Sequence, residues 1–341
     1  MILDEPTAIL PPAERASLFR TIARLRMRGT AIILISHKLE DILDACDRVL
    51  VMRRGRVVST APVAGSSRAD LVRMVVGDDL QAPDRRASVP GSVTLDVRGL
   101  RVRRANGALA VNDVSFDLRR GEIVGLCGVE GNGQSELVQA ITGMIKPDGG
   151  SIVYEMAKGS LVGPVDAAIL RRHGLAHIAE DRLLHATVPT LSLAANWLLT
   201  NLHVPALNTH GRLRHGAVAA AVGRAIDQYA IRAPSTSAML RQLSGGNQQK
   251  LVLARELNLS PLLVVAGHPT RGLDVRTIDF VQRELFQARD RGAAILLLSA
   301  DLTELWQFAD RIGVMTRGRL HGPVSLGATS QQEIGRWMTA Q

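Results

Sequence analysis

The sequence has very few aromatic residues, only two cysteines and no long hydrophobic run, and each absence excludes a class of protein. Phe, Trp and Tyr make up 3% of the 341 residues, whereas apolar residues as a whole make up 46%. The core must therefore be aliphatic, as in α/β proteins whose parallel strands are buried on both faces. Cys46 and Cys127 offer neither a disulfide framework nor metal-ligand spacing, which fits a reducing compartment. No apolar run approaches the roughly 20 residues of a membrane-spanning helix.

The net charge of +9 comes from arginines spread along the chain. Such a charge suits a nucleic acid or a membrane surface as partner. Because no basic patch interleaved with aromatic residues is present, a solvated arginine-rich surface is the simpler interpretation, and we expect no nucleic-acid partner.

A glycine-rich stretch at residues 125–137 (GLCGVEGNGQSEL) is the strongest local motif. It stands between a strand predicted at Glu122–Gly128 and a helix predicted at Ser135–Thr142. In this context glycines let backbone N–H groups surround phosphate oxygens at a helix N-terminus. The usual form has Lys where this chain has Gln134, so the charge that reaches the β/γ-phosphates is lost. The candidate nucleotide-binding residues are Gly128, Gly131, Asn132, Gly133, Gln134, Ser135 and Glu136.

The chain repeats itself at an offset of 263 residues, in one ungapped register. The second copy is preceded by a long segment, about Val93–Val265, that includes the glycine loop and has no equivalent before the first copy. We therefore expect residues 1–78 to be the C-terminal part of a first domain whose N-terminal part is truncated. Residues 79–92 would be a linker and residues 93–341 a second domain. Local patterns in these parts predict a short helix around Asp70–Val76, strands at Val93–Val97, Ala110–Leu118 and Gly174–Arg182, a helix at Val188–Leu202 and a loop at Leu207–His215. Identical pairs include Pro6 and Pro269, Thr7 and Thr270, Ser36 and Ser299, Asp47 and Asp310, and Arg56 and Arg319.

Two acidic residues, Asp4 and Glu5, end an apolar strand at the start of the first copy. In phosphate-loop enzymes an Asp at this place holds Mg²⁺ and the following acid polarises the attacking water. His37 stands just past a buried strand predicted at Thr30–Ser36, where open α/β sheets place ligand contacts. We therefore predict a functional His37, although a lone histidine is more often structural.

The second copy contains LSGGNQQK at residues 243–250, which opens a helix predicted to run to about Leu259, with Ser244 as its cap. A buried strand is predicted at Pro261–Ala266. The second copy lacks all three of the candidate catalytic and metal-binding residues of the first copy. Asp4, Glu5 and His37 correspond to Gly267, His268 and Ala300.

LSGGNQQK after a glycine phosphate loop resembles the ATP-binding-cassette (ABC) ATPases. Two copies in one chain further resemble the ATPase subunits of bacterial importers for simple sugars and nucleosides. The motifs GVEGNGQSEL, AEDR, LSGGNQQK and HPTRGLD look most like the second cassette of the nucleoside-type branch. The resemblance implies an α/β P-loop NTPase fold of ABC-ATPase type, with an antiparallel β subdomain and a helical subdomain. One complete, degenerate cassette would be preceded by a partial one.

In this family two cassettes pair head to tail, and each nucleotide lies between the glycine loop of one and the signature of the other. The resemblance implies that Asp4 binds Mg²⁺, Glu5 is the general base and His37 contacts the γ-phosphate. The signature residues that would complete this site across the interface are Leu243, Ser244, Gly245, Gly246, Asn247 and Gln248.

Glu180, Asp181 and Arg182 fall where the family contacts its membrane subunits. The resemblance implies ATP and Mg²⁺ as cofactors, permease subunits and a solute-binding protein as partners, and a peripheral place on the cytoplasmic face of the cell membrane. The longer protein would have one hydrolytic and one degenerate ATP site, and this chain alone is expected not to hydrolyse ATP.

Two alternatives remain open. One is a soluble tandem-cassette ATPase that acts on ribosomes or nucleic acid, which the positive charge favours, but Gln134 and the short linker count against it. The other is a non-functional gene fragment. The sequence leaves the transported solute undetermined, because solute specificity resides in the binding protein and permease rather than in a cassette.

Overall fold

The computed structural model describes residues 1–4, 6–7, 12–36, 39–53, 56–66, 89–128, 131–157 and 159–339. The chain forms two compact units. Unit 1 comprises Met1–Asp84 together with Gly272–Phe280, and unit 2 comprises Arg85–Arg271 together with Val281–Gln341. Most of the predicted linker, and the short helix expected around Asp70–Val76, lie outside the described residues. Within the described part of the chain, no helix is long and apolar enough to cross a bilayer.

A six-stranded sheet forms the centre of unit 2, in the order β10-β13-β14-β7-β15-β16. All neighbours are parallel except β15 and β16. Every residue of β7, β13 and β14 is buried, which confirms the aliphatic, doubly covered sheet expected from the composition. The strands are β7 (Ile123–Cys127), β10 (Leu175–Ile178), β13 (Leu263–Gly267), β14 (Ala294–Leu298), β15 (Arg311–Thr316) and β16 (Arg319–Ser325).

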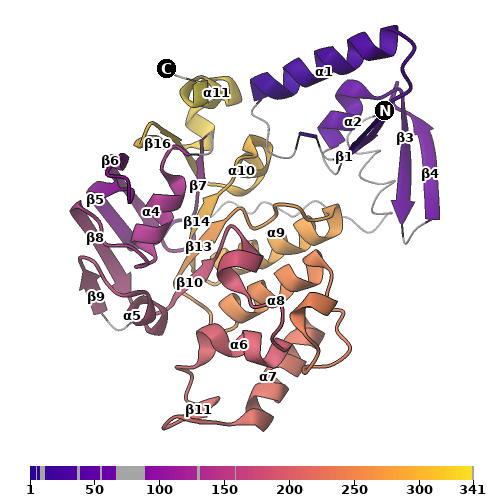
Figure 1. Cartoon of the computed structure of the whole chain (residues 1–341). Helices are drawn as coiled ribbons and strands as arrows, with labels where there is room; N and C mark the ends of the chain where they lie inside the picture. The colour runs from indigo at the N-terminus through magenta and orange to yellow at the C-terminus, as the bar shows by residue number, and fades with distance from the viewer. Residues whose placement is uncertain are drawn as a thin grey trace. The chain divides into compact units, whose positions relative to one another are not determined.

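A second, antiparallel sheet has the order β6-β5-β8-β9. Helix α4 (Gln134–Ile141) packs between the two sheets, and its buried Leu137 and Ile141 belong to one core cluster that includes side chains of both. This sheet is labelled at the left of Figure 1. Its strands β5 and β6 extend beyond the strands predicted at Val93–Val97 and Ala110–Leu118. Its strands are β5 (Val93–Arg103), β6 (Leu109–Arg119), β8 (Gly149–Met156) and β9 (Gly159–Val162).

Helices α6 (Leu193–Asn201), α7 (His215–Gln228) and α8 (Gly245–Leu257) pack together as a helical subdomain (Figure 1). Helix α6 begins later than the helix predicted at Val188–Leu202, because Ser192 accepts a capping hydrogen bond from the Ala195 N–H. A short hairpin precedes α7 where a loop was expected. The other strands and α-helices described in unit 2 are β11 (Asn208–Thr209), β12 (Arg212–Leu213), α5 (Ala167–Arg172), α10 (Leu302–Phe308) and α11 (Gln331–Thr339). Helix α9 (Val275–Asp290) is shared with unit 1.

The internal repeat is visible in the element boundaries. Every regular element described in residues 1–66 has a counterpart 263 residues later, and four of the six pairs have the same two ends. The identical pairs are α1 (Pro12–Met27) with α9, α2 (Leu39–Ala45) with α10, β3 (Arg48–Arg53) with β15, and β4 (Arg56–Pro62) with β16. The shorter strands β1 (Ile2–Asp4) and β2 (Ile33–Ile35) fall within the counterparts of β13 and β14. The two segments therefore fold alike.

Unit 1 differs from unit 2 in the connection between these strands. In unit 2, β7 pairs with both β14 and β15. In the described part of unit 1, no strand stands between β2 and β3, so β1-β2 and β3-β4 are separate two-stranded sheets. Several of their apolar side chains are open to solvent. Ile33 is 59% exposed and Met52 61%, whereas their counterparts Leu296 and Met315 are 0% exposed.

Candidate nucleotide-binding site

The glycine loop connects the buried strand β7 to helix α4, as the motif requires. Gly133 has φ +103°, and a Cβ there would lie 2.0 Å from the carbonyl oxygen of Ala110. Asn132 anchors the loop to the turn between β15 and β16, because its Oδ1 accepts from the Arg317 N–H at 2.9 Å and its carbonyl from the Gly318 N–H at 3.1 Å. Val129 and Glu130 lie outside the described residues. In the described part of the loop, these contacts fix Asn132 and Gly133 against β6 and the turn after β15.

Arg104 holds the loop from the side of the antiparallel sheet. Its Nε donates to Glu136 Oε1 at 2.6 Å and its Nη2 to the Gly131 carbonyl at 2.7 Å. Sequence reasoning missed this residue, since nothing in the sequence links the end of β5 to a loop about thirty positions later. Glu136, a predicted site residue, therefore orients an arginine beside the loop.

Ser135 faces a carboxylate that comes from a different strand. Its Oγ donates to Glu180 Oε2 at 3.4 Å, and the other oxygen of Glu180 accepts from Arg271 Nη1 at 3.1 Å. The Nε2 of His268 lies 3.8 Å from the same Glu180 oxygen. The structure thus brings together Ser135, Glu180 and two residues that follow β13. The sequence did contain one signal for Arg271, because the first copy has Ala8 at that position.

The strand predicted at Gly174–Arg182 ends earlier, at Ile178. Asp181 ends the extended segment because its carboxylate accepts from the Leu183 and Leu184 N–H groups at 2.9 and 3.0 Å. Arg182 turns toward the signature helix, and a Cβ at Gly245 would lie 2.7 Å from its Nη2. The three residues predicted as a permease contact therefore point to three different places, with only Asp181 capping the exposed turn itself.

The signature LSGGNQQK lies at the N-terminus of α8, as predicted. Ser244 occupies the N-cap position and is exposed, but its side chain makes no capping hydrogen bond, and its Oγ instead accepts from Asn247 Nδ2 at 2.8 Å. Asn247 Oδ1 in turn accepts from the Arg232 N–H, and the buried Gln248 donates to the carbonyls of Leu240 and Leu243. The buried hydrogen bonds of Gln248 thus hold the start of the helix in place, while Ser244 is exposed.

A buried ionic cluster ties α8 to its surroundings. The completely buried carboxylate of Glu256 accepts from Arg255 Nε at 2.9 Å and from Arg171 Nη1 at 2.6 Å. Burial alone would raise the pKa of the Glu256 carboxyl, but the two guanidinium groups outweigh it and hold that pKa below its ordinary value. Arg255 Nη1 also donates to the carbonyls of Ala186 and Asn196. The signature helix is thus connected to the segment after Arg182 and to α6.

The first copy shows Asp4 at the end of β1, where it is exposed. The predicted Glu5 and His37 lie outside the described residues. Among the described residues of this copy, the buried carboxylate of Asp41 accepts from the hydroxyls of Thr7 and Ser36 and pairs with Arg15 Nε at 2.7 Å. This contact joins the segment after β1 to the end of β2, the two segments that carry the predicted catalytic groups.

The second copy repeats this contact with Glu304, which accepts from Thr270 at 2.6 Å and from Ser299. Arg15 corresponds to Ile278, so the second carboxylate has no counterpart of that guanidinium. Burial raises the pKa of Glu304 to about 7, although the two hydroxyl donors act to lower it. The two copies thus share a buried carboxylate that accepts from two hydroxyls, but only the first copy pairs it with an arginine.

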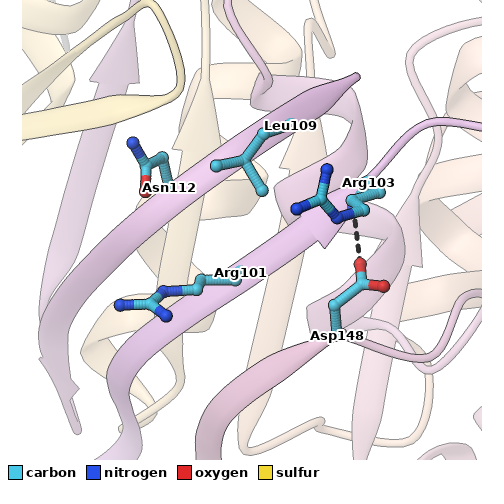
Figure 2. Close-up of a pocket in the computed structure, with 5 residues that line it drawn as sticks. All are labelled: Arg101, Arg103, Leu109, Asn112 and Asp148. Carbon is cyan, nitrogen blue, oxygen red and sulfur yellow. Dashed lines mark hydrogen bonds between the residues drawn. The ribbon is translucent and has the colours of Figure 1, made fainter. Parts of the chain in front are cut away.

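A separate hollow of about 300 Å³ lies on the antiparallel sheet (Figure 2). In Figure 2 Asp148 approaches β5, where its Oδ2 accepts from the Arg103 N–H at 2.6 Å. None of the residues that line the hollow belongs to the glycine loop. They are Arg101, Arg103, Leu109, Asn112 and Asp148.

The six-stranded sheet, the glycine loop at its β7 end, the antiparallel sheet and the helical subdomain together define the P-loop NTPase fold of the ABC type. Residues 111–271 match the family model described as ABC transporter. This part of the chain therefore belongs to the ABC transporter family, and the predicted fold class is confirmed. Of the solved structures with this fold, the ADP conformation of MJ1267, an ATP-binding cassette of an ABC transporter, has a TM-score of 0.57 at 17% identity. That match covers 73% of this chain and 96% of that one.

Curated relatives match along almost the whole chain. The nucleoside import ATP-binding protein NupA of Lactococcus lactis is 36% identical over 98% of this chain, and the guanosine import ATP-binding protein NupO of Bacillus subtilis is 38% identical over 99%. The ribose import ATP-binding protein RbsA 1 of Rubrobacter xylanophilus is 36% identical over 100%. The chain spans 66% of the length of each of these relatives.

Proposed function

We propose that this chain is part of the ATP-binding, energy-coupling subunit of an ABC importer for nucleosides or simple sugars, with nucleosides favoured. One observation carries the proposal. A glycine loop, a signature helix with an exposed Ser244 and a repeated cassette segment occur in one chain that matches nucleoside-import proteins along nearly all of its length. In such a subunit, ATP hydrolysis drives solute movement through a membrane permease supplied by other subunits.

We assign residues 1–78 to a first cassette, residues 79–92 to a linker and residues 93–341 to a second cassette. Among the described residues no strand joins β2 to β3, whereas in unit 2 the equivalent strands are joined by the strand that leads into the glycine loop, and this difference supports the assignment. Ile33 and Met52, which are exposed in unit 1, have buried counterparts in the complete sheet of unit 2. The two cassettes would pair head to tail, with Ser244–Gln248 completing the site of Asp4, Glu5 and His37.

The two sites differ in their fit to Mg²⁺. The glycine loop of unit 2 fits nucleotide phosphates, but Gly267 stands where Asp4 stands in the first copy, and the described residues hold no cluster of three His, Cys, Asp or Glu that could bind a metal. Asp4 would hold Mg²⁺ in the first site, where the ion would stabilise charge on the transferred phosphoryl group. The second site would hold a nucleotide without hydrolysing it.

A contact with permease subunits is supported by exposed apolar side chains beside Glu180–Arg182. Leu184 is 73% exposed and Leu183 48%, on a turn that Asp181 fixes. Exposed apolar groups on an ordered segment are typical of a protein-binding surface. The subunit would then lie at the cytoplasmic face of the membrane. Charge reversal at Asp181, which leaves Glu180 beside Ser135 unchanged, should disrupt transport more than nucleotide binding, and unchanged transport would count against this surface.

The catalytic assignment is tested by phosphate release from the purified chain. We expect no turnover above background, because the glycine loop present here belongs to the cassette that lacks the acid and the histidine. Substantial turnover that persists in both Glu5→Gln and His37→Ala would contradict the assignment.

A further inference from the structure

The phosphate end of the glycine loop in unit 2 is bordered by an exposed ion pair that the usual loop pattern does not include. Glu180 and Arg271 lie 3.1 Å apart, with side chains 32% and 46% exposed. Glu180 also reaches Ser135, the last residue of the glycine pattern, at 3.4 Å. A ligand whose phosphates extend to Ser135 would therefore meet a carboxylate and a guanidinium together.

The glycine at position 267 allows this arrangement. A Cβ at Gly267 would lie 3.2 Å from the Glu180 backbone nitrogen and 3.3 Å from its Cβ, which is tighter than ordinary contact. An acidic side chain there, as in the first copy, would push Glu180 away and repel it. The loss of the strand-end acid and the approach of Glu180 to Ser135 are thus parts of one change.

The same loop has lost its own cation. Gln134 is neutral, and Arg104, which contacts the loop at Gly131, is already paired with Glu136 at 2.6 Å. A triphosphate in this cradle needs positive charge near its β- and γ-phosphates, and in sites with a strand-end acid a bound metal ion contributes it. Arg271 can supply it, since its guanidinium pairs bidentately with phosphate oxygens and its exposure leaves it room to turn.

We propose that Arg271 is the phosphate-binding cation of this cassette and that nucleoside triphosphate competes with Glu180 for it, so that binding needs no divalent metal ion. The inference rests on the proposed nucleotide-holding role of unit 2 and specifies how that site works. Glu180 occupies Arg271 while the loop is empty. Phosphate takes the guanidinium, and the carboxylate turns toward His268, 3.8 Å away, or toward solvent.

The test is calorimetric titration of the whole chain with ATP, ADP and AMP, in EDTA and in excess MgCl₂. For the wild type we expect ATP affinities in the two buffers that agree within about threefold. Arg271→Ala should weaken ATP binding by about tenfold or more, the loss expected for one hydrogen bond between charged groups. Arg271→Lys should be intermediate, because it keeps the charge without the fork. The loss should be smaller for AMP, whose single phosphate does not extend to Ser135.

Glu180→Gln should strengthen ATP binding severalfold, and this gain should vanish in the Glu180→Gln/Arg271→Ala double variant. Arg172→Ala and Glu155→Gln remove exposed charges elsewhere in unit 2 and serve as matched controls. Circular dichroism establishes that each variant is folded.

The outcomes separate the two levels of the proposal. A wild-type chain that binds no nucleotide in either buffer refutes the nucleotide-holding role itself. A wild type that binds ATP, with Arg271→Ala binding it equally well, leaves that role intact and overturns the present inference. ATP binding that is abolished by EDTA and weakened by Glu180→Gln would also overturn it, because the carboxylate would then be holding a metal ion.

Discussion

Replacing Gly133 by alanine tests whether the glycine loop depends on close backbone approach. The new Cβ would lie 2.0 Å from the Ala110 carbonyl oxygen and 3.0 Å from its carbon, and neither atom belongs to a side chain that could turn away. Gly131 provides a matched control, because it also has positive φ, at +91°, but a Cβ there meets no atom of the described residues within 4 Å. The two substitutions therefore share the backbone strain and differ in the clash.

The magnitudes follow from this difference. An alanine held in the left-handed region costs about 1–2 kcal/mol at either position. Forcing a methyl group into packed surroundings adds about 1–3 kcal/mol at Gly133 only. For a unit of this size, each kcal/mol lowers the melting temperature by about 2–4 °C. We therefore expect Gly133→Ala to melt several degrees below Gly131→Ala.

The assays are thermal melting and ATP titration of the purified chain. Relief of the clash must move the loop away from β6, so the N–H groups that face the phosphates lose their alignment, and Gly133→Ala should bind ATP at least about tenfold more weakly than Gly131→Ala. Equal melting temperatures and equal ATP affinities for the two variants would refute the reasoning. A lower melting temperature for Gly133→Ala with unchanged ATP affinity would refute the claim that relief of the clash misaligns the N–H groups that face the phosphates.

Two further predictions concern buried carboxylates. The pKa of Glu304 is raised above that of the unfolded chain, so the folded state holds its proton more tightly; its stability contribution is present at low pH and is lost as the pH rises from about 4.5 through about 7. Glu304→Gln should flatten this part of the stability–pH profile by on the order of 3 kcal/mol, measured by urea unfolding between pH 5 and pH 8, and a profile with the wild-type slope would exclude Glu304 as its source. Glu256→Gln should destabilise unit 2 by about 3–5 kcal/mol, because two guanidinium groups lose their buried counter-charge. The exposed Glu155→Gln should stay within about 0.5 kcal/mol of the wild type, and a similarly small effect at Glu256 would show that the ionic cluster is not needed for stability.

Features set by local pattern could be predicted from the sequence. The strand, loop and helix around Gly128–Ser135 follow from apolar residues, spaced glycines and a helix start, and the structure has them within one residue of the expected bounds. The repeat could be predicted because a common register preserves the same local pattern twice, and α1 and α9 accordingly have matching ends. The boundary of an element was less predictable where one side chain sets it, as Asp181 does after β10 and Ser192 does at the start of α6.

The contacts between strands distant in sequence were not predictable. Glu180 follows β10 and Arg271 follows β13, and these strands are neighbours only because the sheet order places them side by side. The resemblance implied a membrane contact for Glu180, and the contact between its carboxyl and Ser135 became visible only in the structure. The residue type of Ser244 predicted a helix cap, but its hydroxyl accepts a hydrogen bond from the Asn247 side chain and caps no backbone N–H group.

The sequence by itself determined the motif inventory of this protein: a glycine loop without its lysine, a signature helix, and two copies of one segment of which the second has lost its acids and its histidine. These properties depend on residue identity and spacing along the chain, and folding does not change them. Only the tertiary structure decided which charges meet at the loop, that Glu304 is buried without the arginine that Asp41 has, and that no strand of the described residues joins β2 to β3. Those properties depend on the order of strands in a sheet and on the exclusion of water, to which residues far apart in sequence contribute together.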